Sequence, residues 1–442
     1  MKLIFYGGAK EVGRSCIYVE EKNSSILLDA GIKLGNQIEL PLIPDEIVKK
    51  IDNIIITHTH LDHVGFLPIK FSDKNVNIYS TKPTRDLLHV LLSDFYRLQS
   101  QEKKLFSLKD IDSIMKKIKP IEYYKDINFD GLSFRLLEAG HILGSAMVLL
   151  NPERRVYVDD VYHRGKLLYT GDFNITLSRI LNSCERNINV ENLIIETTYG
   201  GKEDIFPSQK EIVNNFVKSL NETLTNNGVV IIPAFAVGRA QEILILLNDL
   251  IKAKKILECN IYLDGMLKKA LKIYRQNVIY AKKEIQLRIL LNDDDPFKSK
   301  FFKVSKKKDK SDVKGPCIIV TTSGMVSGGP IINYLKKFGK DANNKIIFIG
   351  YQAEGTNGRK ILNGERVIEF ENEKIEINAK IEQHRFSGHS DRNGLLSFIN
   401  SIKGLKRIFL VHSEKEKAEE FAKCLSKKFD VIIPDLCEEY SI

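Results

Sequence analysis

The chain has 442 residues, of which 43% are hydrophobic and 28% charged, and its formal net charge is +10. This balance is typical of a soluble globular protein, so it excludes a largely disordered chain and an integral membrane protein. The length exceeds one ordinary hydrophobic core and predicts two or three domains. The positive excess favours a polyanionic partner, although lysines spread over solvated faces would give the same number.

The N-terminus and the cysteines indicate a cytoplasmic protein. Residues 1–8 read as a strand running into a glycine turn rather than as a signal peptide, and no apolar stretch is long enough to cross a bilayer. The six cysteines form no C-x-x-C pair, so neither a disulfide framework nor a thiolate zinc site is indicated. We therefore expect a cytoplasmic location and no membrane partner.

The first 200 residues alternate short apolar runs with turns, which predicts the strands of a large sheet system. The runs lie at residues 2–6, 25–28, 53–56, 76–79, 133–137, 146–150, 166–169 and 192–195. One amphipathic helix, with proline near its start, is predicted over residues 83–101.

From about residue 201 the pattern changes to strands that alternate with helices, which predicts a parallel, helix-covered sheet and an α/β fold class. Helices are predicted at residues 208–224, 238–252 and 265–280, and strands at 228–232, 260–263, 317–321 and 345–349. The charged segment 292–316 is expected to be a mobile surface loop; the alternative is phosphate binding by its lysines. Short strands then return, with a helix at 414–429.

A dense group of metal-ligand side chains follows the apolar run that ends at Ile56. His58, His60, Asp62 and His63 fall within six residues. Burying three imidazoles and a carboxylate together is unfavourable unless something offsets their desolvation, and such nitrogen and oxygen ligands suit zinc or a similar divalent ion. A histidine-rich polar surface loop is the alternative, but three of the nine histidines gathering by chance is a weaker explanation.

Further reactive side chains share one placement, because each follows directly on a predicted strand. They are Asp29, His141, Asp172, Glu196 and His412. In layered α/β proteins, sites assemble at the carboxyl edge of the sheet, where loops converge over a rigid base. A lone aspartate after a strand is more often a turn or cap residue, but six such placements, counting the His58–His63 group, predict one site.

The number of candidate ligands predicts two metal ions. Seven side chains qualify, whereas one tetrahedral zinc uses three or four: they are His58, His60, Asp62, His63, His141, Asp172 and His412. If Asp172 bridges, His58, His60 and His141 complete one zinc site. Asp62, His63 and His412 then complete the other. The residual positive charge would suit an anionic phosphodiester.

Together these residues resemble the metallo-β-lactamase superfamily, and specifically its β-CASP branch of nucleic-acid-processing nucleases. H-x-H-x-D-H alone indicates only the superfamily; the branch is indicated by E-T-T-Y-G at 196–200, T-S-G-M-V-S-G-G at 322–329, S-G-H-S-D at 387–391 and L-V-H-S-E at 410–414. The pattern is similar to archaeal homologues of the nuclease subunit of the cleavage and polyadenylation specificity factor and to RNase J-like relatives. KH domains, which often precede such chains, are not expected here.

The resemblance implies a metallo-β-lactamase αββα sandwich formed by residues 1–200 and 376–442. A parallel-sheet β-CASP domain at 201–375 would interrupt it, with the active site in the cleft between the two.

The resemblance also implies residue roles. Asp62 would orient the attacking water as well as bind metal, His389 would protonate the leaving oxygen while Glu196 holds it, and Asp29 would support the ligand loop. Ser387 and Gly388 would receive a terminal phosphate. Arg239, Arg359 and Ser323 are further candidates for RNA contact, and helix-start or turn chemistry is the alternative for the two arginines.

The expected activity is zinc-dependent hydrolysis of single-stranded RNA, in 3′-end processing or 5′-to-3′ decay, by a metal-dependent endo- or exoribonuclease. His412 favours RNA, because related DNA-repair members tend to carry valine there. The alternatives are a β-CASP nuclease acting on DNA and a non-catalytic RNA-binding scaffold subunit. Partners would be single-stranded RNA, a second copy of the chain in a homodimer, and other RNA-processing or decay factors.

Overall fold

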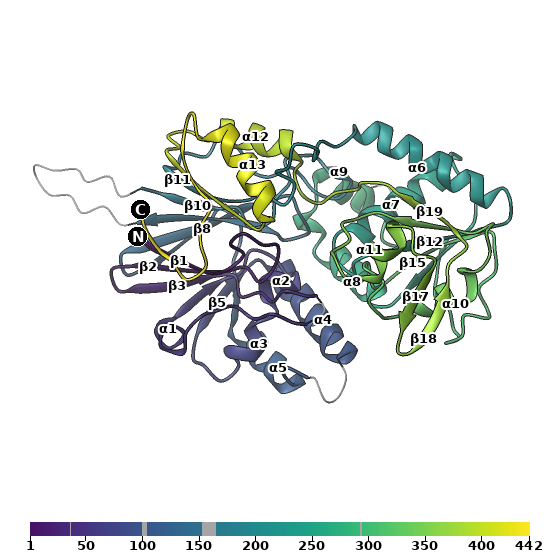
Figure 1. Cartoon of the computed structure of the whole chain (residues 1–442), viewed down its shortest axis with the longest axis horizontal. Coiled ribbons are helices and arrows are strands. Elements are labelled where there is room, and N and C mark those ends of the chain that lie inside the picture. The colour runs from purple at the N-terminus through teal and green to yellow at the C-terminus, as the bar shows by residue number, and fades with distance from the viewer. Residues whose placement is uncertain (36, 100–103, 153–164, 292–293) are drawn as a thin grey trace, which may run out of the picture. The chain divides into compact units, whose positions relative to one another are not determined.

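The computed structural model describes residues 1–35, 37–99, 104–152, 165–291 and 294–442. The chain forms two compact units (Figure 1). Unit 1 comprises residues 1–205 and 389–442, and unit 2 comprises residues 206–388. No helix of the described residues is both long and apolar enough to span a membrane.

The first sheet of unit 1 has the strand order β22-β1-β2-β3-β4-β5-β6. Strands β22 to β3 pair antiparallel, and β3 to β6 pair parallel. The strands are β1 (Lys2–Gly7), β2 (Cys16–Glu21), β3 (Ser24–Leu28), β4 (Asn53–Ile55), β5 (Asn77–Ser80), β6 (Ile118–Pro120) and β22 (Glu439–Ser441). The helices in this part of the chain are α1 (Asp45–Lys50), α2 (Leu61–Val64), α3 (Leu67–Lys70), α4 (Lys82–Leu98) and α5 (Leu108–Lys117).

The second sheet of unit 1 has the order β21-β20-β11-β10-β9-β8-β7. Its strands are β7 (Asp126–Phe129), β8 (Leu132–Glu138), β9 (Ala146–Pro152), β10 (Leu167–Tyr169), β11 (Asn192–Glu196), β20 (Arg407–Val411) and β21 (Asp430–Ile432). Two C-terminal helices, α12 (Arg392–Ser401) and α13 (Lys415–Leu425), belong to the same part of the unit and are yellow in Figure 1. The second sheet is therefore completed by residues from both ends of the chain.

Three apolar layers hold unit 1 together. One joins the first sheet to its helices, as Ile54 on β4 and Leu88 on α4 illustrate. A middle layer lies between the sheets and joins Phe5 to Phe134 and Phe409. A third joins the second sheet to α12 and α13, with Phe398 and Phe421 among its members. Because each sheet buries both faces, the unit is an αββα sandwich, and the predicted fold is confirmed.

Unit 2 contains a parallel sheet of order β14-β13-β15-β12-β16-β19. Its strands are β12 (Val229–Pro233), β13 (Asn260–Asp264), β14 (Phe302–Lys303), β15 (Cys317–Thr321), β16 (Lys345–Phe348) and β19 (Lys380–Gln383), and β17 (Val367–Phe370) pairs with β18 (Glu373–Glu376). The helices are α6 (Gln209–Leu224), α7 (Arg239–Lys252), α8 (Leu267–Gln276), α9 (Lys283–Leu291), α10 (Ile331–Phe338) and α11 (Asn357–Leu362). The predicted inserted parallel sheet is thus confirmed.

Some predicted elements differ in extent. The helix predicted over 83–101 ends at Leu98, and residues 100 and 101 lie outside the described residues. The helix predicted over 265–280 is α8 followed by a 3-10 turn at Val278–Tyr280. The sequence placed the return to the first domain at residue 376, whereas β19 pairs within the sheet of unit 2, and unit 1 resumes at His389.

The surface loop expected over 292–316 needs correction. Residues 292 and 293 lie outside the described residues, but the rest is anchored. Phe297, Phe301 and Val313 are buried, and β14 pairs with β13. The Lys310 ammonium is also buried, 2.5 Å from Oδ2 of Asp264. Apolar side chains spaced along the charged segment hold it against the sheet. They were overlooked in the sequence because lysines dominate this segment.

Candidate metal centre

The candidate side chains of unit 1 follow strands that end at neighbouring positions. Asp29 follows β3, and two residues separate His58 from the end of its neighbour β4. In the second sheet β10, β11 and β20 are parallel, and Asp172, Glu196 and His412 lie at or just after their carboxyl ends. β8 is antiparallel to β9, which is antiparallel to β10, so β8 delivers His141 to the same edge.

The loop that carries the first ligands is held by the loop after β3. Ala30 N–H donates to the His63 carbonyl over 2.8 Å, and Ile32 N–H donates to the Leu61 carbonyl over 3.0 Å. Gly31 lies between them, where a Cβ atom would come within 1.7 Å of the Asp62 carbonyl oxygen. Only glycine permits this approach, so the sequence at Gly31 fixes the position of helix α2.

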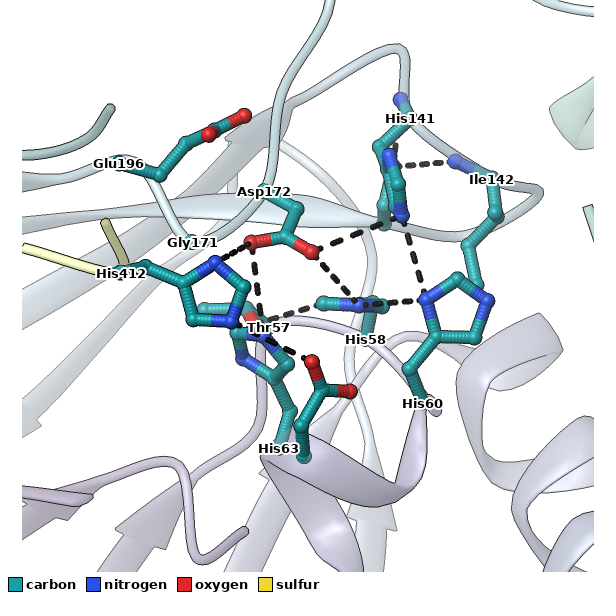
Figure 2. Close-up of polar contacts among 12 residues, drawn as sticks. Thr57, His58, His60, His63, His141, Ile142, Gly171, Asp172, Glu196 and His412 are labelled. Atoms are coloured by element: carbon teal, nitrogen blue, oxygen red, sulfur yellow. Dashed lines mark hydrogen bonds and ion pairs between the residues drawn. The ribbon is translucent and has the colours of Figure 1, made fainter. Parts of the chain in front are cut away.

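The first ligand group consists of His58, His60, His141 and Asp172. Nδ1 of His60 lies 3.1 Å from Nε2 of His58 and 3.2 Å from Nε2 of His141. Oδ2 of Asp172 lies 3.5 Å from Nε2 of His58 and 3.7 Å from Nε2 of His141. Figure 2 shows Asp172 reaching toward these rings from the second sheet.

The second ligand group consists of Asp62, His63 and His412, and it faces the other oxygen of Asp172. Oδ1 of Asp172 lies 3.4 Å from Nε2 of His63 and 3.6 Å from Nδ1 of His412. Oδ2 of Asp62 lies 3.3 Å from Nε2 of His412. Asp172 therefore presents one oxygen to each group, as the dashed lines in Figure 2 show.

The donor atoms have the separations that a metal ion requires. Tetrahedral coordination with bonds of about 2.0–2.1 Å places ligand atoms about 3.3 Å apart, close to the separations in both groups. Within each group the candidate donor atoms lie within 4.8 Å of one another. Nε2 of His63 and Oδ1 of Asp172 are buried and have no hydrogen-bond partner among the described residues. Buried polar atoms without partners are unfavourable, so a cation at this position would satisfy them.

Asp29 supports this arrangement from behind. Its Oδ2 accepts hydrogen bonds from the Thr57 hydroxyl over 2.8 Å and from the Tyr169 hydroxyl over 2.9 Å. The same oxygen lies 2.7 Å from Nδ1 of His63. A proton on Nδ1 leaves Nε2 of His63 with its lone pair toward Asp172, which is the tautomer that a metal needs.

The charge state of the metal-free cluster follows from burial and from its carboxylates. Burial and the neighbouring His63 hold the pKa of His58 well below its usual value. Burial alone would lower the pKa of His63, but Asp172 and Asp29 outweigh it and raise that pKa well above the usual value. Burial would raise the pKa of Asp172, yet His63 and His412 hold it well below the usual range. A bound cation would therefore replace a proton that His63 otherwise keeps.

Glu196 and His389 form a pair beside the first ligand group. Oε1 of Glu196 lies 2.8 Å from Nδ1 of His389, and Nε2 of His389 lies 4.0 Å from Oδ2 of Asp172. The His389 ring stands between that of His141, at 4.6 Å, and that of Tyr199, at 5.9 Å, between centroids. A histidine oriented in this way can transfer a proton at the nitrogen that faces the cluster.

Three family models match successive parts of the chain. The metallo-beta-lactamase superfamily domain matches residues 18–196, the Beta-Casp domain residues 240–361, and the Zn-dependent metallo-hydrolase RNA specificity domain residues 374–434. The chain belongs to the β-CASP metallo-hydrolase family.

Two curated relatives of this β-CASP metallo-hydrolase come from Methanocaldococcus jannaschii. An RNase J-like protein is 37% identical, with 97% of this chain and 96% of the relative covered. Transcription termination factor FttA is 36% identical, with 97% of this chain and 69% of the relative covered. A crystal structure of a protein of unknown function from Enterococcus faecalis aligns with a TM-score of 0.59 over 99% of each chain at 13% identity, which shows a shared fold.

The remaining candidates of the β-CASP metallo-hydrolase lie in unit 2. Nη1 of Arg239, the first residue of α7, donates to the Ser387 carbonyl over 3.1 Å. A Cβ atom on Gly388 would lie 3.0 Å from Nη2 of the same arginine. Arg239 therefore packs against the segment that leads into His389, and the backbone at Gly388 leaves room for it.

Arg359 and Ser323 have local partners in unit 2. Nη2 of Arg359 lies 2.8 Å from Oε1 of Glu354, which offsets its charge. The Ser323 hydroxyl accepts a hydrogen bond from Ser327 N–H over 2.9 Å within the glycine-rich loop. An ion pair thus accounts for the contact of Arg359 and a turn hydrogen bond for that of Ser323, and the role of both residues in RNA binding stays a prediction.

The sequence left three residues around the centre unidentified. Thr57 and Tyr169 donate to Asp29, and Tyr199 lies beside His389. Each stands within three residues of a recognised site residue, namely His58, Asp172 and Glu196. Nearness in sequence to a recognised site residue could have pointed to them. Both tyrosines, however, are equally compatible with ordinary core packing.

Proposed function

We propose that the chain is a zinc-dependent ribonuclease that hydrolyses phosphodiester bonds of single-stranded RNA, by internal cutting, 5′-to-3′ trimming or both. The observation that carries the proposal is the placement of Asp172, whose two oxygens face separate histidine groups at 3.4–3.7 Å. The matched RNA specificity domain and the name of the RNase J-like relative favour RNA as the polymer.

His58, His60 and His141 would hold one zinc ion, Asp62, His63 and His412 would hold a second, and Asp172 would contribute to both. Nitrogen and oxygen donors without thiolate suit zinc among the divalent ions. Two such ions supply Lewis acidity toward the phosphate and make water more acidic. The side chain of Asp62 is 32% exposed, so it is accessible to orient the attacking water.

The pair of Glu196 and His389 would deliver the proton that the leaving oxygen requires. Glu196 is buried and lies against Nδ1 of His389, so Nε2 is the nitrogen available for transfer. Ser387, Gly388, Arg239, Arg359 and Ser323 are proposed to contact RNA. The proposed domain division is a metallo-β-lactamase domain at 1–200 and 376–442, interrupted by a β-CASP domain at 201–375.

The deciding experiment uses one single-stranded RNA labelled in turn at each end, with either a 5′-monophosphate or a 5′-triphosphate. We expect cleavage that a chelator abolishes and zinc restores, and about two zinc ions per chain by elemental analysis. Asp62→Asn should remove cleavage without unfolding the protein, as checked by circular dichroism. Full activity of that variant, or no cleavage of RNA by the zinc-loaded wild type, contradicts the proposal.

A single-stranded DNA of the same sequence serves as the second substrate. Cleavage of DNA but not RNA would assign the chain to the alternative, a DNA nuclease of the same family. RNA binding without hydrolysis, together with fewer than two ions, would support the scaffold alternative. The cytoplasmic location, the homodimer and other processing partners stay predictions.

A further inference from the structure

A second cationic site lies at one end of unit 2. Lys252, Lys254, Lys298 and Lys300 line a surface hollow of about 440 Å³ together with Glu258 and Phe301. We name this hollow the lysine groove. Its four lysines and one glutamate leave a surplus of three positive charges.

The topology places the lysine groove at the amino edge of the sheet. Helix α7 starts after the carboxyl end of β12 and runs back to Lys252, just before β13 begins at Asn260. Residues 298–301 lead into β14, which is parallel to β13, so they reach the same edge. Arg239 and Lys252 are the first and last residues of α7, which has 14 residues and is therefore about 21 Å long. The groove is therefore separate from the predicted RNA contacts.

Only two of the four lysines of the groove have a carboxylate partner among the described residues. Lys252 pairs with Asp294 at 2.5 Å, and Lys300 lies 3.7 Å from Glu258. Lys254 and Lys298 are exposed and have no carboxylate within ion-pair distance among the described residues. The end of a helix attracts cations and accounts for Lys252 and Lys254. It does not account for Lys298 and Lys300, which arrive from another segment.

The residue at the base of the groove, Phe301, is held in place by burial and by a backbone hydrogen bond. Phe301 is 6% exposed, and its carbonyl accepts a hydrogen bond from Ile261 N–H over 2.8 Å at the start of β13. The Lys300 ammonium lies 4.9 Å from the centre of the Phe301 ring. Lysines held around a fixed floor can contact phosphates without first ordering a loop, which reduces the entropic loss on binding.

We propose that the lysine groove binds the phosphate backbone of RNA, as a second site remote from Arg239. The proposal rests on the proposed ribonuclease function for the identity of the ligand. Contacts of this kind are independent of base sequence, and each phosphate neutralised on single-stranded RNA makes the negative slope of log K against log salt steeper by about 0.7. The groove would thus retain long RNA while the other end of unit 2 holds a different part of it.

The test replaces the two lysines that have no ion pair, in the variant Lys254→Gln/Lys298→Gln. Neither substitution leaves a carboxylate without its partner. The control, Lys109→Gln/Lys116→Gln, removes the same charge from exposed positions on α5 of unit 1. Affinity for a 40-nucleotide RNA is measured by fluorescence anisotropy across a salt series, with gels to verify that the RNA stays intact. Thermal unfolding verifies the fold of both variants.

In the groove variant we expect the negative slope of log K against log salt to become shallower by about 1.4, because two phosphate contacts are lost. In the control the slope should stay at the wild-type value. An unchanged slope in the groove variant overturns the proposal. Tripolyphosphate is titrated in parallel, and loss of its binding with an unchanged RNA slope assigns the groove to free polyphosphates and also overturns it. Absence of RNA cleavage by the wild type would instead count against the proposed function, since the slope depends on binding alone.

Discussion

Oδ2 of Asp29 lies 2.7 Å from Nδ1 of His63, and both side chains are buried. This contact makes His63, a proposed metal ligand, depend on a residue outside both ligand groups. The backbone of Asp29 itself has a φ of +57°, a value that residues other than glycine rarely adopt. Strained backbone of this kind persists where the surroundings fix it, here through bonds to Thr57 and Tyr169.

Asp29→Ala should weaken zinc binding by about 10–100-fold, because His63 loses the partner that sets its tautomer and orientation. Zinc affinity is measured by competition with a chromophoric chelator. The matched control is Tyr169→Phe, which removes one hydrogen bond to Asp29 and leaves the contact with His63 in place. Equal loss of affinity in the two variants would show that general destabilisation, not orientation of His63, is responsible.

His412→Val should lower the zinc content from two ions to one. His412 belongs to the second ligand group only, so His58, His60, His141 and Asp172 remain for the first ion. Elemental analysis after gel filtration measures the content. The reciprocal variant His60→Ala should also retain one ion. A His412→Val protein that keeps two ions would remove His412 from the ligand set.

His389→Ala should reduce kcat by about 10²–10⁴-fold while both zinc ions stay bound, because in the proposed function the residue transfers a proton and is not a metal ligand. Turnover of labelled RNA and elemental analysis are measured on the same preparation. His89→Ala, an exposed histidine on α4, is the control and should match the wild type. Loss of a zinc ion in His389→Ala would instead make His389 a ligand, as its closeness to Asp172 permits.

Glu382→Gln should destabilise the protein by about 1–2 kcal/mol at pH 7, because Lys345 is 1% exposed and loses its nearest carboxylate, at 2.5 Å. Burial would raise the pKa of Glu382, but Lys345 outweighs it and lowers that pKa. A lowered folded-state pKa gives stability that is present above the ordinary value of 4.5 and is lost as pH falls through the folded value. The variant should therefore lose less stability than the wild type on acidification.

Urea unfolding at pH 7 and pH 4, followed by circular dichroism, tests this pair. Lys345→Met should cost less than Glu382→Gln, since it removes the buried charge together with its need for a partner. Glu376→Gln is the control, because its pair with Lys340 is exposed and should contribute less than about 1 kcal/mol. The same acid sensitivity in Glu382→Gln and the wild type would exclude Glu382 as the titrating group.

The sequence predicts those strands and those members of the ligand cluster that short-range sequence patterns mark. His58 to His63 are adjacent in the chain, and His141, Asp172 and His412 follow apolar runs that strands require. The structure brings all of these together, because the strands end at one edge. Strand β2, helix α5 and the anchoring of residues 294–316 were not predicted, since they depend on pairing and burial between distant segments.

The contacts that orient the ligands were also beyond the sequence. Nothing local distinguishes Tyr169, which packs in the middle layer of unit 1 and also reaches Asp29, from a tyrosine that only packs. Gly31 is a similar case, since the need for glycine comes from the Asp62 carbonyl thirty-one residues away. Such requirements follow from tertiary distances that hydrophobic periodicity does not encode.

The split of unit 1 between residues 1–205 and 389–442 sets an order in which the centre can be built during translation. The first ligand group is complete once residue 172 has left the ribosome, and its strands lie N-terminal to unit 2. His389 and His412 emerge only after all of unit 2 has been made. A nascent chain therefore has the first proposed ligand group and two members of the second, but it lacks His412 and the proposed proton donor His389. Under the proposed function, cleavage of RNA would therefore begin only after the residues that follow unit 2 have joined unit 1.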